Sequence, residues 1–195
     1  MSVIRQLSLF GVEAAAPEPG DLAGLLAGGG QVVRLGGTAR VSIVVDHPWR
    51  AAVLVAECAR RGLAATCVST VEDHIGVRTA YSALLNPLAE TWLVGAVKRA
   101  PRGLVLDGRA LRLWVEASGR AEGATSYALP LGRSDEPAWE SIGSALATVG
   151  LAAQLVSPRG GTGPSYRLVG RRRTARLAEM VGDPPKQAPV DVWPS

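Results

Sequence analysis

LAGLLAGGG, at residues 22–30, is a run of small and apolar residues that ends in three glycines. A second run of nine residues, LRLWVEASG at 111–119, begins 89 positions later and also ends in glycine. Each run predicts a helix that stops at its glycine, because glycine readily adopts the left-handed conformation found just after a helix. Two such runs indicate that one structural unit occurs twice.

The segments that follow the two runs also correspond. After each comes an extended stretch, RVSIVVD at 40–46 and SYALPLG at 126–132, and then a helix that starts at a proline. Two further strands and a closing helix complete each copy. We therefore predict two α/β units, about residues 21–95 and 110–183, packed about a pseudo-twofold axis, since a solenoid needs more and shorter copies. The paired positions are Pro48 and Pro137, Trp49 and Trp139, Gly62 and Gly150, and Tyr81 and Tyr166.

The order helix, two strands, helix, two strands, helix, occurring twice, resembles the LAGLIDADG homing-endonuclease fold, which also underlies the N-terminal part of the sporulation regulator WhiA. The resemblance covers about residues 21–183 and implies an α+β fold with two pseudo-symmetric LAGLIDADG-like repeats, to which we add flexible N- and C-terminal tails. It also implies that the two named helices pack together at the centre and that two sheets form a saddle over DNA. Ala23, Gly24 and Ala27 suit a close helix contact, whereas Trp114 is bulkier than the family pattern.

The chemistry of the family does not follow from its shape. Its nucleases carry an acidic residue at the eighth motif position of each helix, and these carboxylates hold the divalent metals, which prefer oxygen ligands. Those positions are Gly29 and Ser118 in this chain. We therefore expect no metal-dependent cleavage, no metal and no cofactor. Glu116 occurs in one copy only, and we interpret it as a solvated or structural carboxylate.

Other patterns typical of catalysis are weak. The stretch EDH, at Glu72 to His74, lies between expected strands, and this position favours a turn over a metal site. Cys58 falls in an apolar helix and needs no reactivity. The stretch SPRGGTGPS at 157–165 lacks the lysine and hydroxyl residue of a phosphate-binding loop and favours a hairpin loop. No active site is predicted.

Composition restricts the class of protein. The 195 residues are 47% hydrophobic and 19% charged, which predicts one globular unit and excludes a disordered chain. Two cysteines are too few for a secreted disulfide scaffold, and no apolar run suggests a signal peptide or a membrane span. We expect a cytoplasmic protein with no membrane partner, and association with the nucleoid is left open.

Arginines gather near the end of the second repeat. The net charge is +4, which permits contact with nucleic acid without requiring it. A guanidinium group suits phosphate geometry, so the cluster is a candidate nucleic-acid-binding site. The alternative is a solvated helix entrance. Arg34, Arg40 and Arg78 would join a basic saddle only if their strands point them the same way. The cluster consists of Arg167, Arg171, Arg172, Arg173 and Arg176.

The N-terminal arm carries QLSLF at residues 6–10, with the only phenylalanine of the chain. All five positions match the short peptide by which bacterial replication and repair proteins hold the sliding clamp, the β subunit of DNA polymerase III. The resemblance implies that apolar anchors fill a pocket of the clamp. The alternative is an arm that folds onto its own core. The five residues are Gln6, Leu7, Ser8, Leu9 and Phe10.

We divide the chain into a flexible arm and linker at 1–20, the repeat domain at 21–183 and an extended proline-rich tail at 184–195, with Trp193 as a surface anchor. The preferred hypothesis is a non-enzymatic accessory of DNA replication or repair that is tethered to the clamp. The alternative is a WhiA-like DNA-binding or protein-interaction module in transcription. This alternative is weakened because the sequence after residue 183 shows no helix-turn-helix segment. A residual nuclease ranks third, and the oligomeric state is left open.

Overall fold

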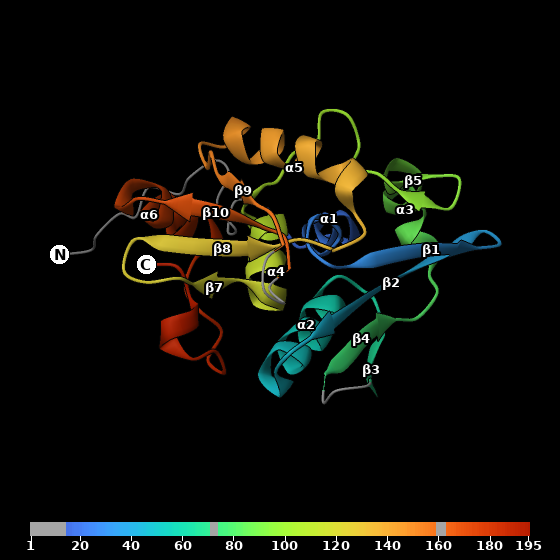
Figure 1. Ribbon diagram of the computed structural model, residues 1–195. Coiled ribbons are helices and arrows are strands. Elements are labelled where there is room, and N and C mark those ends of the chain that lie inside the picture. Colours follow the sequence, from blue (N-terminus) through green and yellow to red (C-terminus); the bar gives the residue numbers. More distant parts are fainter. Residues whose placement is uncertain (1–14, 71–73, 159–162) are drawn as a thin grey trace.

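Two four-stranded antiparallel sheets flank a pair of central helices in the computed structural model (Figure 1). The structure describes residues 15–70, 74–158 and 163–195. Helices and strands are both plentiful and every strand pair is antiparallel, so the predicted α+β class is confirmed.

The first repeat contains the strand order β1-β2-β4-β3. A short hairpin of β5 and β6 follows it and leads into the second repeat. The bounds are η1 Pro19–Leu22, α1 Ala23–Ala27, β1 Gln31–Leu35, β2 Thr38–Val45, α2 Pro48–Arg60, β3 Ala65–Ser69, β4 Ile75–Thr79, η3 Ala83–Leu85, α3 Asn86–Trp92, β5 Leu93–Val94 and β6 Val97–Lys98.

The second repeat contains the strand order β7-β8-β10-β9, which is the same topology. Its helices and strands follow one another in the same order as those of the first repeat, so the internal duplication is confirmed. The bounds are α4 Gly108–Ser118, β7 Arg120–Ala121, β8 Ser126–Pro130, α5 Glu136–Thr148, β9 Gln154–Val156, β10 Ser165–Val169, α6 Arg171–Val181 and η4 Val190–Val192.

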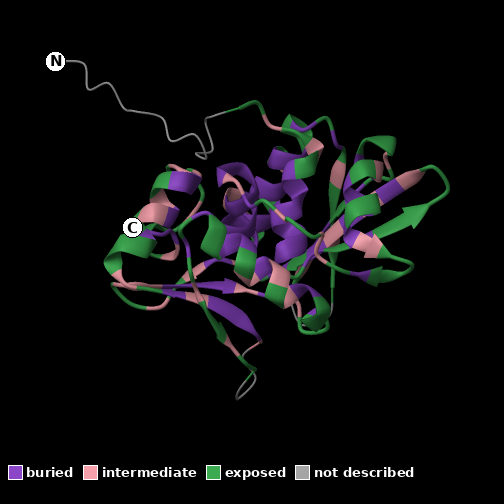
Figure 2. Cartoon of the chain, turned by 90° about the horizontal axis from the view of Figure 1, so that it is seen from above, coloured by how far each residue is buried: buried purple, intermediate pink, exposed green. Residues whose placement is uncertain are grey.

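The two central helices, α1 and α4, pack together where Gly24 meets Ala110. A Cβ atom on Gly24 would lie 1.7 Å from the carbonyl oxygen of Ala110, so only glycine permits this approach. Directly after the end of α1, a Cβ atom on Gly28 would lie 2.8 Å from Nε1 of the fully buried Trp114. The bulky indole of one copy therefore occupies space that glycine leaves in the other. The helices form the buried centre of the molecule (Figure 2).

The bounds of the central helices differ from the predicted runs because of local capping. Helix α4 begins at Gly108, ahead of the run at 111–119, since the Asp107 carboxylate accepts the N–H groups of Arg109 and Ala110 at 3.1 and 2.9 Å. Helix α1 ends at Ala27, and the N–H of Gly30 donates to the carbonyl of Leu25 at 2.8 Å. Both corrections arise at helix ends, where capping contacts decide the boundary.

The C-terminal tail is not a free extended segment with a surface tryptophan, so that expectation is wrong. Trp193 is 6% exposed, and its Nε1 donates to the carbonyl of Gly182 at 2.8 Å. The Tyr127 hydroxyl donates to the carbonyl of Val192 at 2.9 Å. Prolines exclude an α-helix, but they do not prevent the chain from folding back to bury an indole, which removes a large apolar surface from water.

The last residues of the expected linker are also held. The Arg109 guanidinium donates to the carbonyl of Ala16 at 2.7 Å and lies 3.4 Å from the Glu18 carboxylate, and η1 begins at Pro19. The prediction of a flexible segment up to residue 20 is therefore wrong for these positions, because a buried arginine requires partners. The QLSLF stretch lies outside the described residues. Within the described ranges, no helix has the length and apolar character needed to cross a bilayer.

Candidate nucleic-acid interface

Each sheet has an open face that points away from the hydrophobic core. On this face, a row of residues runs across each sheet through cross-strand pairs, since directly paired residues of antiparallel strands share a face. Every member except Ala128 is at least partly exposed. The first row is Gln31, Ser42, Arg78 and Thr66, and the second row is Arg120, Ala128, Arg167 and Gln154.

The two rows are equivalent in the duplicated fold. Arg78 pairs with the second strand of its sheet through Ser42, and Arg167 pairs with the second strand of its sheet through Ala128. The two arginines are 89 positions apart, the same spacing as the two glycine-ended runs. The duplication therefore places one arginine at the same position on the open face of each sheet.

Alternation along the strands settles which other arginines share this face. Arg40 lies two residues from Ser42 on β2 and faces the same way, and its guanidinium stacks over Tyr81, 4.6 Å from the ring centroid. Arg34 pairs with the buried Ala39 and so points to the opposite side, where it lies 3.5 Å from the Glu90 carboxylate. Arg40 and Arg78 thus point to the same open face, as a basic saddle requires, whereas Arg34 does not.

The two open faces differ in electrostatics. The Glu122 carboxylate lies 2.6 Å from Arg167 and 3.7 Å from Arg120, which partly neutralises the second row. Arg78 makes no ion pair with any described residue, and it borders a hollow of about 140 Å³ beside Gly76. The positive charge of Arg78 is therefore the more available of the two equivalent arginines.

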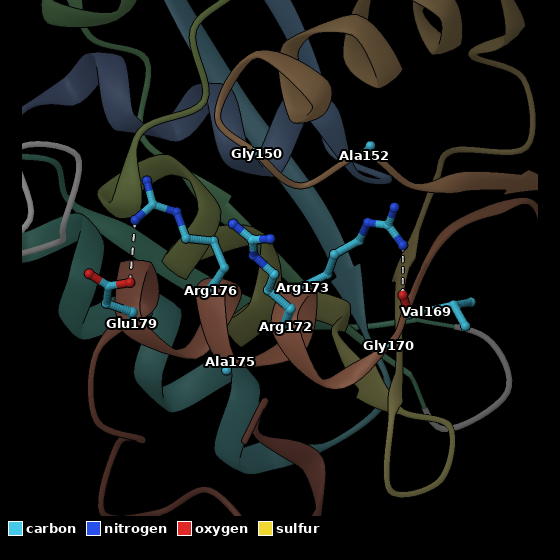
Figure 3. Close-up of a pocket in the computed structure, with 9 residues that line it drawn as sticks. All are labelled: Gly150, Ala152, Val169, Gly170, Arg172, Arg173, Ala175, Arg176 and Glu179. Atoms are coloured by element: carbon cyan, nitrogen blue, oxygen red, sulfur yellow. Dashed lines mark hydrogen bonds and ion pairs between the residues drawn. The ribbon is translucent and has the colours of Figure 1, made fainter.

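The predicted cluster of five arginines is divided between two faces of the second sheet. Arg167 belongs to the open face. Its neighbours Tyr166 and Leu168 face the core, which they share with Leu177 and Met180 of α6. Helix α6 therefore lies behind the sheet, and three of its arginines line a separate hollow (Figure 3). Arg171 is exposed at the first residue of α6.

The C-terminal ends of the central helices are where the family pattern would place metal-binding acids. Gly29 is exposed there and Ser118 is partly buried. Among the described residues, no group of histidine, cysteine and acidic side chains could hold a metal ion. Of the EDH stretch, Glu72 and Asp73 lie outside the described residues. Burial raises the pKa of the Cys58 thiol to about 11, so Cys58 is an unreactive core residue.

Buried cations cap these helix ends instead. Nζ of Lys98 donates to the carbonyls of Leu26 and Gly30 at 2.9 and 2.7 Å at the end of α1. The Arg50 guanidinium donates to the carbonyls of Glu116 and Gly119, both at 2.8 Å, at the end of α4. The last carbonyls of a helix lack intrahelical partners and carry negative partial charge, so a cation there is stabilising.

Each capping cation pairs with a carboxylate at an equivalent position. Asp46 lies 3.0 Å from Arg50, and Asp135 lies 2.5 Å from Lys98, with the two aspartates 89 positions apart. Burial lowers the pKa of Lys98 and of Arg50, and the hydrogen bonds to these carboxylates oppose that shift. Sequence reasoning did not identify this pair of caps. The spacing of 89 positions between Asp46 and Asp135, which matches the repeat, is the sequence signal that could have indicated these caps.

Glu116 is structural and not solvated, since it is 0% exposed. Nε of Arg112 lies 2.8 Å from its Oε1, whereas Oε2 is buried and has no hydrogen-bond partner in the described part of the chain. Burial raises the pKa of Glu116 to about 7, although the charge of Arg112 opposes the shift. This carboxyl is enclosed within the protein and is not placed to bind an external ligand.

Solved structures share this architecture, although no protein-family model and no curated protein matches the sequence. The N-terminal LAGLIDADG domain of DUF199/WhiA superposes with a TM-score of 0.61 at 14% identity, over 95% of this chain and 97% of that domain. The fold is LAGLIDADG-like. The homing endonuclease I-WcaI bound to its DNA recognition sequence matches this LAGLIDADG-like chain with a TM-score of 0.60 at 12% identity, over 88% and 84% of the two chains.

A third solved structure, full-length DUF199/WhiA from Thermatoga maritima, has a TM-score of 0.60 and 12% identity, and the match covers 87% of this chain and 56% of that one. At these identities the likeness establishes the LAGLIDADG-like fold and no more. The function must therefore be argued from the residues of this chain.

Proposed function

We propose that the open faces of the two sheets bind a DNA duplex. The observation that carries the proposal is the equivalent placement of Arg78 and Arg167, one on each open face. A duplex presents phosphates on both sides of a groove, and guanidinium groups at equivalent positions suit such a repeating target. I-WcaI, which shares the fold, is bound to its DNA recognition sequence, and this supports DNA as the ligand.

We propose further that the chain does not cut the DNA. Gly29 and Ser118 supply no carboxylate at the motif positions. The buried charges of Lys98 and Arg50 lie at the ends of both central helices, where they oppose the entry of a divalent cation. A metal ion would therefore find no carboxylate at the motif positions, and the nearby Asp46 and Asp135 are already paired with Arg50 and Lys98.

The QLSLF arm supports a proposed tether to the bacterial sliding clamp, and with it an accessory role in DNA replication or repair. The described chain begins at Ala15, near Arg109 in the first turn of α4. The second sheet begins at Arg120, beyond the other end of that helix, about 16 Å away at 1.5 Å per residue. The start of the described chain and the second sheet thus lie at opposite ends of α4.

The likeness to the WhiA domain, which covers nearly the whole of both chains, favours a second candidate. In that case the protein is a DNA-binding or protein-interaction module in transcription, and its arm has another role. Binding to the clamp distinguishes the two candidates, because a transcription module does not require it.

The DNA proposal is tested by fluorescence anisotropy with a short labelled duplex over a range of salt concentrations. The double variant R78A/R167A should bind more weakly, and the slope of log affinity against log salt should fall by about 2, since each lost phosphate contact contributes about 0.9. The double variant R99A/R102A is a matched control, because both residues are exposed and lie outside the two rows. Equal affinities and slopes for the wild type and R78A/R167A would contradict the proposal.

The absence of cleavage is tested with supercoiled plasmid in magnesium or manganese. We expect no nicked product over the background of a metal-free reaction. Cleavage that needs the metal and persists in Glu116→Ala would establish a nuclease and refute this part of the proposal.

The clamp tether is tested with the double variant L9A/F10A of the full chain. Each apolar side chain contributes about 1.5–3 kcal/mol when buried, so affinity for the clamp should fall by about two orders of magnitude or more. The thermal midpoint should stay unchanged. A lower midpoint, together with no clamp binding by the parent chain, would instead assign these residues to the protein's own core.

A further inference from the structure

A hollow of about 840 Å³ lies on the flank of the second repeat, between α6 and the connection from α5 to β9 (Figure 3). Arg172, Arg173 and Arg176 project from α6 along it, and Glu179 is the only acidic residue among the described lining. We call it the flank hollow. Its lining residues are Gly150, Ala152, Val169, Gly170, Arg172, Arg173, Ala175, Arg176 and Glu179.

The positive charge of the flank hollow is largely uncompensated. The side chain of Arg172 makes no hydrogen bond or ion pair with a described residue, and the side chain of Arg173 donates to a neutral partner, the carbonyl of Val169, at 2.8 Å. Arg176 lies 3.3 Å from the Glu179 carboxylate, but both side chains are exposed enough that this pair contributes little. An anionic ligand would therefore meet at least two available guanidinium groups.

The opposite wall of the flank hollow is low. On that wall Gly150 adopts a positive φ angle of 83°, which favours glycine, and Ala152 carries only a methyl group. Gly170 has a φ angle of 103° and lies on the arginine side, directly before α6. A Cβ atom on either glycine would meet nothing within 4 Å, so open space extends beyond the backbone. A phosphate group can thus approach the arginines without displacing a large side chain.

Two features favour a nucleic acid over an acidic protein as the ligand. Arg172 and Arg176 are one helical turn apart, a rise of about 6 Å, and successive phosphates of one strand are about 3.4 Å apart along a duplex axis, so both arginines can reach phosphates of one strand. Among the described residues of the lining there is no aromatic residue and only one large aliphatic residue, Val169. Protein partners usually need buried aromatic or aliphatic anchors.

The flank hollow and the open face of the second sheet point to different sides. Arg167 lies on the open face, whereas α6 packs behind the sheet through Leu177 and Met180. A straight duplex on the open face therefore lies on the other side of the sheet from α6, and the two surfaces approach each other only at the end of β10, at Val169. We infer that the flank hollow binds the phosphate backbone of a second DNA segment, so that one molecule holds two segments together. This inference rests on the proposal that the open faces bind the first.

The test is co-capture with the full chain. An immobilised duplex is loaded with protein, and retention of a second, fluorescent duplex is measured. The wild type should retain it, and the double variant R172E/R176E should retain about tenfold less while its anisotropy affinity for a single duplex stays within about twofold. The double variant R99E/R102E, which makes the same change in net charge at exposed positions, should behave like the wild type.

The thermal midpoint of R172E/R176E should equal that of the wild type, because neither arginine is buried. Unchanged co-capture by R172E/R176E would overturn the inference, since bridging would then arise from self-association. Unchanged co-capture together with loss of binding to poly-glutamate would overturn it in favour of an acidic protein partner. Failure of the open-face proposal would give different results. R78A/R167A would then bind a single duplex normally, and R172E/R176E would lose all DNA binding.

Discussion

Lys98 and Asp135 join the two repeats through a buried ion pair of 2.5 Å. Lys98 ends β6 after the first repeat, and Asp135 immediately precedes α5 of the second. The same lysine caps α1, and Arg50 of α2 caps α4 in the equivalent way. The centre of the fold, which carries metal-binding acids in the family's nucleases, is thus stabilised here by internal cations.

Lys98→Met should lower the free energy of unfolding by about 3–5 kcal/mol. The change leaves the Asp135 carboxylate and the terminal carbonyls of α1 buried without their cation, and removal of one partner of a buried ion pair typically costs this amount. Urea denaturation measures the loss. Lys186→Met is the control, since Lys186 is exposed and should change stability by less than about 0.5 kcal/mol. An unchanged urea midpoint for Lys98→Met would show that the cap contributes nothing.

Gly24→Ala should destabilise the protein by about 1–3 kcal/mol or more. The added methyl group would overlap the backbone of Ala110, which cannot move aside without separating α1 from α4. Thermal denaturation provides the measurement. Gly20→Ala is the matched control, because a Cβ atom there meets nothing within 4 Å. Equal midpoints for the two variants would contradict the close helix contact.

Glu116→Gln should flatten the dependence of stability on pH between about 4.5 and 7. Burial raises the pKa of Glu116 from 4.5 to about 7, so within this window the folded protein binds a proton that the unfolded chain has lost. Stability from this group is therefore present at low pH and is lost as the pH rises, by about 3 kcal/mol in all.

The neighbours of Glu116 do not mask this effect. Burial acts to raise the pKa of Glu57, but hydrogen bonds from Arg61 and Arg60 prevail and lower it. Glu57 therefore loses its contribution only as the pH falls below its ordinary pKa. Urea denaturation at a series of pH values compares wild type with Glu116→Gln. Parallel profiles across the window would show that Glu116 does not titrate there.

Trp193→Ala should cost about 3–5 kcal/mol, the range for removal of a buried aromatic side chain. The indole also stacks under Arg112, whose guanidinium lies 5.3 Å from the ring centroid. Val190→Ala is the control, since Val190 is 87% exposed in the same tail. If both variants melted like the wild type, the tail would contribute nothing to the stability of the repeat domain.

The sequence by itself determined the repeated architecture and the absence of acids at the two motif positions. Helix ends at glycine, helix starts at proline and alternation along strands are local signals. The runs at 22–30 and 111–119, together with the matched segments that follow them, therefore predicted the repeated fold. Gly29 and Ser118 could be read directly from those runs, because the motif position of each residue follows from its place in the run.

Only the tertiary structure decided which charged residues act together. The registers of β8, β9 and β10 separated Arg167 from the arginines of α6, although they are close neighbours in sequence. Packing brought Lys98 to a helix end about 70 residues earlier in the chain, and it buried Trp193 against the domain that precedes it. Such contacts depend on how complete elements pack, and a linear pattern of side chains carries no direct record of that packing.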